Sequence, residues 1–249
     1  MKHVQHHAKH RNVGKNIVII IMLIVFLAGL CYALYPIMTG VTLIRESRMA
    51  VANFLQIVAD EAAPVADNTT TPYSKLLAAM QAYNETIYTE GQSGLCDAWA
   101  YTQPSFDLAE YGIEDGVIGV LSIPKISLEM PIYLGATYEN MAKGAAHLSQ
   151  TSLPIGGENT NSVIAGHRGW QVAPFFLRLD ELEIGDEITV MNLWGVLAYQ
   201  VREIRIIEPS DIDAILIQPG HDMLTLITCH PYASGGRYRL VVYCERVIE

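Results

Sequence analysis

Residues 117–123 read VIGVLSI, and this run opens a series of short apolar segments that continues almost to the end of the chain. Runs rich in β-branched residues and separated by turn residues are typical of β-strands. Six more follow: MPIYLG (130–135), NSVIAG (161–166), DEITVM (186–191), VLAYQVREIRII (196–207), MLTLIT (223–228) and YRLVVYCERV (238–247). About seven strands with short interruptions predict a mainly β domain, a closed or nearly closed β-barrel. Brief helical pieces are expected at 138–143, 174–182 and 211–217.

The region before the barrel has helical character. Residues 41–63 place Leu43, Ala50, Phe54, Ile57 and Val58 at three- and four-residue steps, and 73–88 does the same after a polar break at 64–72. Residues 91–112 have no clear period and predict a long loop. Loops of that length inside a compact domain are usually lids, binding loops or disordered segments.

A membrane anchor is predicted at the N-terminus. Residues 17–35, IVIIIMLIVFLAGLCYALY, hold no charge and approach the roughly 20 apolar residues that span a bilayer. The preceding residues 1–16 carry four Lys or Arg and no acid, which predicts a cytoplasmic tail and an extracellular domain. A cleaved signal peptide is the alternative, but the run exceeds the usual h-region of about 7–15 residues and no A-x-A-like site follows. A lipoprotein-type site at Cys31 is disfavoured by the bulky Leu30.

The outer region is strongly acidic. Because the first 35 residues hold four of the 16 basic residues and none of the 26 acidic ones, the remainder has a net charge of −14. Such a domain is a poor candidate for binding nucleic acid or an anionic membrane surface. The cysteines are Cys31, Cys96, Cys229 and Cys244; Cys96 and Cys244 could pair outside the cell, but the chain lacks a dense disulfide framework. A free cysteine there requires a chemical reason.

Cys229 is the candidate nucleophile. It ends the run TLITC (225–229), and a strand that delivers its last side chain to the barrel rim fixes the angle at which a nucleophile meets a carbonyl. A buried core cysteine is the alternative. His167, in AGHRG (165–169) with a glycine before it and another two residues after it, is the candidate acid/base; a solvated histidine on a turn is the alternative. His147, His221 and His230 compete with it, although His230 adjoins Cys229 and neighbours in an extended chain point to opposite faces.

Arg239 is the candidate cation. With Arg237 it opens the last strand, and an arginine beside the cysteine could stabilise oxyanion charge or favour the thiolate. An exposed arginine at the rim is the alternative, and Arg237 remains the second choice.

Taken together, these segments resemble the sortase family of cysteine transpeptidases. The shared features are the T-L-x-T-C strand end, a histidine after a small-residue turn, and an arginine ten residues past the cysteine before an L-V-V run. The intervening text is also similar, in MPIYLGATYENMAKGAAHLSQTSLPIGGENTNSVIAGH (130–167) and EPSDIDAILIQPGHDMLTLITCHPY (208–232). The resemblance covers about 117–247. It implies a sortase-type barrel of about eight strands, with a cytoplasmic tail at 1–16, a transmembrane helix at 17–35, a helical arm and lid loop at 36–112 and a catalytic barrel at 113–249.

Within the family, the chain is most similar to class C, the pilin-polymerising sortases of Gram-positive bacteria. These carry a helical extension and a lid with an Asp-Pro-aromatic motif, to which Asp97-Ala98-Trp99 corresponds. The resemblance implies that Asp97 meets the arginine and that Trp99 covers the cysteine. Ala98 replaces the usual proline, which implies a less rigid loop. The second hydrophobic anchor common in class C does not follow the last strand.

The resemblance also implies a function. Cys229 would attack an LPXTG-like sorting signal to form a thioester, with His167 and Arg239 assisting and with Thr228 and His230 near the substrate or oxyanion. A lysine of the next pilin would then release it; no metal and no cofactor are expected. The rivals are a housekeeping sortase that uses a peptidoglycan amine, a cysteine peptidase, and a non-catalytic surface scaffold.

Overall fold

Residues 117–246 form a closed barrel of eight strands, in the order β1-β2-β3-β4-β7-β8-β6-β5. The computed structural model describes residues 6–61, 72–105, 107–169 and 173–247. The strands are β1 (Val117–Ile123), β2 (Leu128–Leu134), β3 (Ala145–His147), β4 (Thr160–Ala165), β5 (Glu187–Asn192), β6 (Gly195–Ile207), β7 (Asp222–His230) and β8 (Tyr238–Arg246). The mainly β prediction and the closed barrel are therefore confirmed.

All seven predicted strands are present, and the eighth, β3, was missed. Its three residues are too few to give a periodic signal, yet it pairs in parallel with β2 and antiparallel with β4. Without this short strand the sheet would be open between β2 and β4. His147, expected as a turn residue, is therefore a fully buried strand residue.

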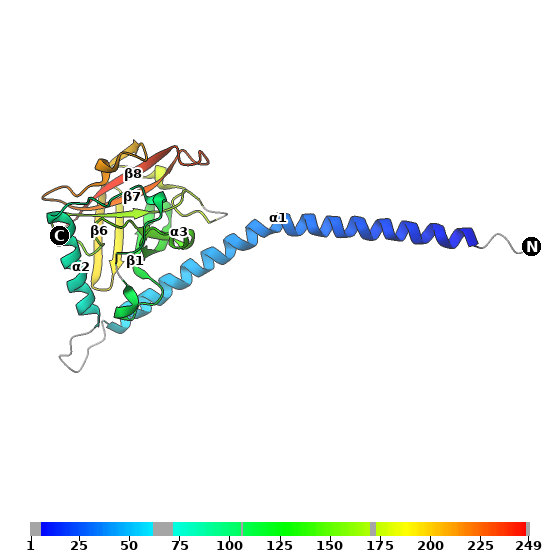
Figure 1. The fold of residues 1–249 in the computed structure, drawn as a ribbon, viewed down its shortest axis with the longest axis horizontal. Helices are drawn as coiled ribbons and strands as arrows, with labels where there is room; N and C mark the ends of the chain where they lie inside the picture. Colours follow the sequence, from blue (N-terminus) through cyan, green and yellow to red (C-terminus); the bar gives the residue numbers. More distant parts are fainter. Residues whose placement is uncertain (1–5, 62–71, 106, 170–172, 248–249) are drawn as a thin grey trace, which may run out of the picture.

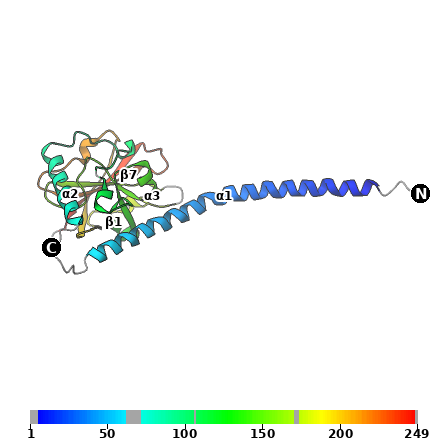
Figure 2. The same ribbon diagram turned by 60° about the horizontal axis from the view of Figure 1, so that its bottom comes forward.

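Helical segments pack against the outside of the barrel at different places (Figures 1 and 2). They are α1 (His6–Glu61), α2 (Pro72–Thr89) and α3 (Tyr138–Lys143). The C-terminal part of α1 contacts β1 and β2, where Val51 and Phe54 are 5% and 1% exposed. Leu43, Ile57 and Val58 pack beside them, so the predicted apolar face is confirmed.

The predicted anchor and arm form one continuous helix. α1 projects away from the barrel toward its N-terminal end (Figure 1), and residues 17–27 are exposed apolar side chains. In the described part of the chain, this is the one helix long and apolar enough to cross a bilayer. Residues 1–5 of the basic tail and most of the polar break at 64–72 lie outside the described residues.

Two of the predicted helical pieces are shorter than expected. Of the predicted piece 174–182, only Leu179–Glu181 is helical, and of 211–217 only Ile212–Ile215; both are single 3₁₀ turns. The third piece, 138–143, is an α-helix over its whole predicted length. The long loop after α2 also contains two 3₁₀ turns, Ala98–Ala100 and Leu108–Tyr111, each capped by an aspartate that precedes it. A side-chain cap of this kind stabilises a turn without any apolar periodicity, which explains why the turns were missed.

The four cysteines are free thiols in the structure. Cys244 lies in the barrel core with no exposed surface, and burial raises the pKa of its thiol. Because Cys96 and Cys244 are both free, the disulfide bond considered between them is absent from this structure. Packing accounts for Cys244.

Candidate active site

Strand register brings the three predicted site residues to one end of the barrel. β7 lies between β4 and β8; Cys229 is directly opposite Arg239, and Ala165 is aligned with Ile227. The parallel alignment continues one step further, because the amide of Gly166 donates to the Ile227 carbonyl at 3.1 Å. His167 therefore follows the end of β4 beside the position of Cys229. Neighbouring strands thus bring Cys229 close to His167, 62 residues earlier in the chain, and to Arg239, 10 residues later.

The turn that carries His167 is held by packing that requires glycine. A Cβ on Gly166 would lie 2.8 Å from the ring of Phe176, which is fully buried. The His167 carbonyl accepts hydrogen bonds from the amides of Gly169 and Phe176 at 2.9 and 3.0 Å. These contacts hold the histidine backbone at the end of the barrel, with its side chain largely buried.

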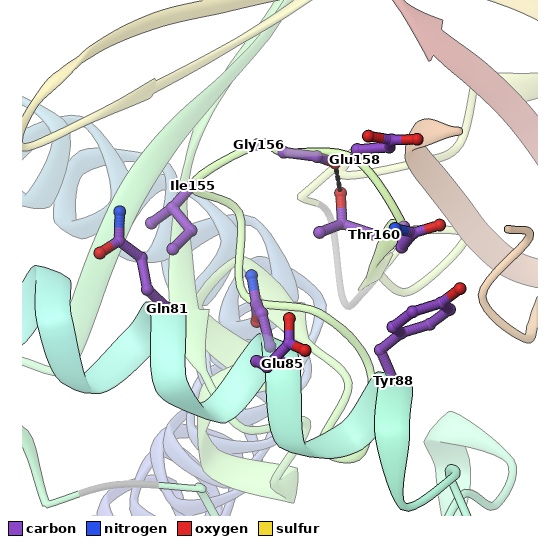
Figure 3. Close-up of a pocket in the computed structure, with 10 residues that line it drawn as sticks. Gln81, Glu85, Tyr88, Ile155, Gly156, Glu158 and Thr160 are labelled. Atoms are coloured by element: carbon purple, nitrogen blue, oxygen red, sulfur yellow. Dashed lines mark hydrogen bonds between the residues drawn. The ribbon is translucent and has the colours of Figure 1, made fainter. Parts of the chain in front are cut away.

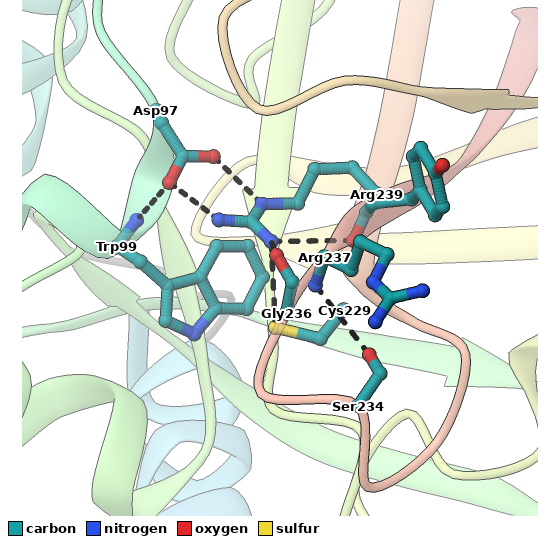
Figure 4. Close-up of polar contacts among 8 residues, drawn as sticks. Asp97, Trp99, Cys229, Ser234, Gly236, Arg237 and Arg239 are labelled. Carbon is teal, nitrogen blue, oxygen red and sulfur yellow. Dashed lines mark hydrogen bonds and ion pairs between the residues drawn. The ribbon is translucent and has the colours of Figure 1, made fainter.

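Arg239 contacts both the cysteine and the lid. Its Nη1 donates to Cys229 Sγ at 3.7 Å and to the Gly236 carbonyl at 2.7 Å. Its Nε and Nη2 each donate to one carboxylate oxygen of Asp97 at 2.7 Å, a bidentate ion pair (Figure 4). The arginine side chain is only 6% exposed. Any ligand that takes the guanidinium must therefore first displace Asp97.

Trp99 lies across the same group of side chains. The Arg239 guanidinium is 4.3 Å from the centre of the Trp99 ring, a cation–π contact. The His167 ring is 6.1 Å from it at a steep angle. Asp97 caps the 3₁₀ turn by accepting from the Trp99 amide at 3.3 Å. One carboxylate thus holds the turn and the arginine together, so the segment 97–99, the predicted lid, lies over Arg239 in this structure (Figure 4).

This position of the lid favours the neutral forms of the cysteine and histidine. Burial raises the pKa of the Cys229 thiol; Arg239 and Arg168 oppose this shift, and the Asp97 carboxylate adds to it. Burial lowers the pKa of His167. Both shifts disfavour charge, so a thiol and a neutral imidazole are the resting pair.

Removing the lid carboxylate is expected to accelerate alkylation of Cys229. Asp97 raises the cysteine pKa, so Asp97→Ala lowers it; at pH 7, well below that pKa, each unit of decrease gives about tenfold more thiolate. Asp97→Ala/Trp99→Ala should therefore react with iodoacetamide several-fold faster than the parent, as measured by mass spectrometry at Cys229. Asp107→Ala, which removes the cap of the neighbouring turn, is the matched control. Equal rates in the parent and the double variant would refute a lid role.

Thr228 and His230, the two residues predicted to lie near substrate or oxyanion, flank Cys229 on β7. The Thr228 hydroxyl is fully buried and donates to the Gly166 carbonyl at 2.7 Å. This hydrogen bond joins β7 to the His167 turn, and the role of Thr228 near substrate stays a prediction. His230 is half-buried and its Nδ1 is 2.7 Å from Nη1 of Arg168.

The competing residues lie elsewhere. Burial lowers the pKa of His147 to about 4, and its ring contacts Ser152 and Thr151. His221 pairs with Glu245 at the opposite end of β7. Arg237 is exposed, and Figure 4 draws its guanidinium turned away from Asp97. Of the two arginines, only Arg239 contacts the cysteine.

Two contributors at this end of the barrel were missed from the sequence. Gly236 approaches so closely that a Cβ would lie 3.2 Å from Cys229 Sγ, and its φ of +78° favours glycine. Arg168 contacts His230 and forms an ion pair with Asp180. The doublet Gly235-Gly236 is a sequence signal that could have indicated the role of Gly236. No periodicity in the sequence links Arg168 to His230 or Asp180.

A separate polar hollow lies between α2 and residues 155–160, lined by Gln81, Asn84, Glu85 and Tyr88 from the helix (Figure 3). It contains none of the predicted site residues. The candidate site is therefore the cluster under the lid and not this hollow.

A closed β-barrel with a thiol, an imidazole and a guanidinium at the ends of adjoining strands defines a cysteine-centred barrel protein. A family model described as the sortase domain matches residues 121–247, just over half of the chain. Sortase D of Bacillus subtilis strain 168 is 33% identical over 131 residues, which are 52% of this chain and 63% of the relative. The chain thus spans less than two thirds of that relative's length.

Solved structures agree with the sequence match. Sortase C1 of pilus island 1 from group B Streptococcus has a TM-score of 0.70 and 32% identity, covering 82% of this chain and 93% of its own. Sortase C of Streptococcus pneumoniae has a TM-score of 0.68 and 33% identity, covering 80% and 97%. The chain belongs to the sortase family, and these structural neighbours are class C sortases.

Proposed function

We propose that this protein is a membrane-anchored transpeptidase that polymerises pilins. The observation that carries the proposal is the placement of Cys229 directly opposite Arg239, one strand from the turn of His167. An Arg–Asp pair and a tryptophan close over this cluster. The similarity to class C sortases supports the pilin assignment, since one of these neighbours, from Streptococcus pneumoniae, is described in connection with pilin substrate specificity.

The chemistry begins when a sorting signal of the LPXTG type displaces the lid. As the sulfur attacks the threonine carbonyl, the Cys229 thiol gives its proton to His167 and becomes the thiolate nucleophile. The bond from threonine to glycine then breaks, and the protonated His167 gives that proton to the departing glycine amine. Arg239 and backbone amides near the cysteine stabilise the tetrahedral oxyanion. Displacing Asp97 favours this step because it removes a negative charge beside the sulfur.

The thioester is then resolved by an amine. A lysine amine of the next pilin attacks the acyl carbon, gives its proton to the now neutral His167, and releases the cysteine sulfur. The thioester keeps the acyl group activated after the original peptide bond has broken. The new isopeptide bond therefore forms without consumption of ATP. Water in place of the amine would make the protein a peptidase.

The anchor sets where this reaction takes place. The apolar residues 17–35 would span the membrane, with residues 1–16 in the cytoplasm because of their basic charge. The remainder of α1 would form the arm that holds the barrel, residues 113–249, at the outer surface. An epitope tag at each end, tested for protease access in intact cells, would establish the orientation.

The acceptor distinguishes pilus assembly from cell-wall anchoring. The full chain in detergent would be incubated with an LPXTG peptide and, separately, with a lysine-bearing pilin or a peptidoglycan stem-peptide amine. Mass spectrometry is expected to find the isopeptide product with the pilin. A product with only the wall amine would indicate a housekeeping sortase, and hydrolysis unaffected by either amine would indicate a peptidase.

A further inference from the structure

Arg168 is a second cation that the fold buries beside the candidate site. Its side chain is 7% exposed. Nη2 lies 2.5 Å from Oδ2 of Asp180, and Nη1 donates to Nδ1 of His230 at 2.7 Å. Its Nε is buried with no hydrogen-bond partner in the part of the chain that the structure describes. The structure therefore retains a desolvated charge whose donors are not all satisfied.

Burial of this kind is costly unless the charge is paired, and an apolar residue of similar size is often as stable in such a place. Asp180 offsets part of the cost, although its carboxylate is 47% exposed. His230 supplies no counter-charge in this contact, because the guanidinium of Arg168 is only a donor and Nδ1 accepts its hydrogen bond. A buried cation with one exposed counter-charge favours a role beyond stability.

The position of Arg168 suggests that role. Arg168 directly follows His167, and His230 directly follows Cys229. The backbone hydrogen bonds between β4 and β7 continue as far as the amide of Gly166, and the Thr228 hydroxyl donates to the carbonyl of the same glycine. Beyond them, the contact from Arg168 to His230 is a side-chain bridge between the segments that carry the histidine and the cysteine.

We propose that Arg168 is a positioning residue that fixes the spacing of His167 and Cys229 and holds a permanent positive charge near the sulfur. The assignment rests on the proposed function for its catalytic meaning. The opposing effect of Arg168 on the raised cysteine pKa agrees with it. Lysine cannot reproduce the role, because a single ammonium cannot direct donors to His230 and Asp180 as a planar guanidinium does.

The test uses the full chain in detergent with Asp97→Ala as the background, so that the lid is open. Arg168→Gln should move the pH midpoint of Cys229 alkylation by iodoacetamide upward, since it removes a cation near the thiolate. Arg168→Lys should leave that midpoint close to the background. Both should lower kcat by about tenfold or more, with KM nearly unchanged, because a misplaced reacting group slows chemistry and not binding.

His230 provides an independent arm that leaves Arg168 in place. His230→Asn keeps an acceptor near the position of Nδ1 and should retain kcat within about threefold, whereas His230→Ala should lose about tenfold. The proposal would be overturned if Arg168→Gln had the same pH midpoint of Cys229 alkylation and the same kcat as the Asp97→Ala background. If Arg168→Gln does not fold, equal kcat values for His230→Ala and His230→Asn would do the same. Alkylation of Cys229 requires no substrate, so it tests the charge effect of Arg168 separately from the proposed function. If Arg168→Gln shifts the pH midpoint of alkylation but the protein shows no transpeptidation, the charge effect stands and the proposed function is contradicted.

Discussion

Replacing Cys229 with alanine is expected to abolish transpeptidation. In the proposed reaction the residue supplies the enzyme atom that bonds to the acyl group, so turnover should fall by about 10⁴-fold or more, to the background rate. Peptide cleavage and amine ligation, each followed by mass spectrometry, measure the loss. Cys229 lies half-buried at the rim, so its truncation should change the melting temperature little.

Cys31→Ala is the matched control, since Cys31 is an exposed cysteine in the apolar part of α1. It should retain full turnover. A non-catalytic scaffold predicts a different pattern, in which Cys229→Ala changes stability without removing any activity. Residual ligation by Cys229→Ala above the background would contradict the proposed nucleophile.

The second large effect is expected at Arg239. Arg239→Lys keeps the positive charge but loses the planar fork that contacts Cys229, Gly236 and Asp97. If this guanidinium stabilises the oxyanion, kcat should fall by about 10²- to 10³-fold, the usual cost of removing one such donor. Single-turnover measurement of thioester formation isolates that step.

Arg237→Lys is the corresponding control, because Arg237 stands two residues earlier in the chain and is exposed. Its turnover should remain within about twofold of the parent, as is usual for surface substitutions. A larger loss at Arg237 than at Arg239 would exchange the roles of the two arginines and contradict the geometry of the site.

Much of this site could be predicted because its geometry follows from strand ends. A cysteine that ends one apolar run and an arginine that opens the next are directly opposite when the two strands pair as a hairpin, as Cys229 and Arg239 do. Adding His167 required the family resemblance, because nothing in the local sequence states that β4 and β7 are neighbours. The same resemblance located Asp97 and Trp99 in a loop without periodicity.

The remainder depended on tertiary contacts. The strand β3 is only three residues long, and its pairing is set by the strands on either side. Strand alternation turns Thr228 to the face opposite Cys229, but its hydrogen bond to the Gly166 carbonyl depends on the turn that follows β4 lying beside β7. The contacts of Arg168 with Asp180 and His230 join three segments whose proximity only the closed barrel creates.

The most direct test is to identify where the acyl group is bound. The full chain in detergent, with Asp97→Ala to open the lid, would be mixed with an LPXTG peptide in the absence of an amine, quenched in acid and mapped by tandem mass spectrometry. A single thioester through threonine on Cys229 is expected, and it should not form in His167→Ala or Arg239→Ala within the same reaction time. An acyl group on another residue, or unchanged acylation of Cys229 in those two variants, would contradict a shared site.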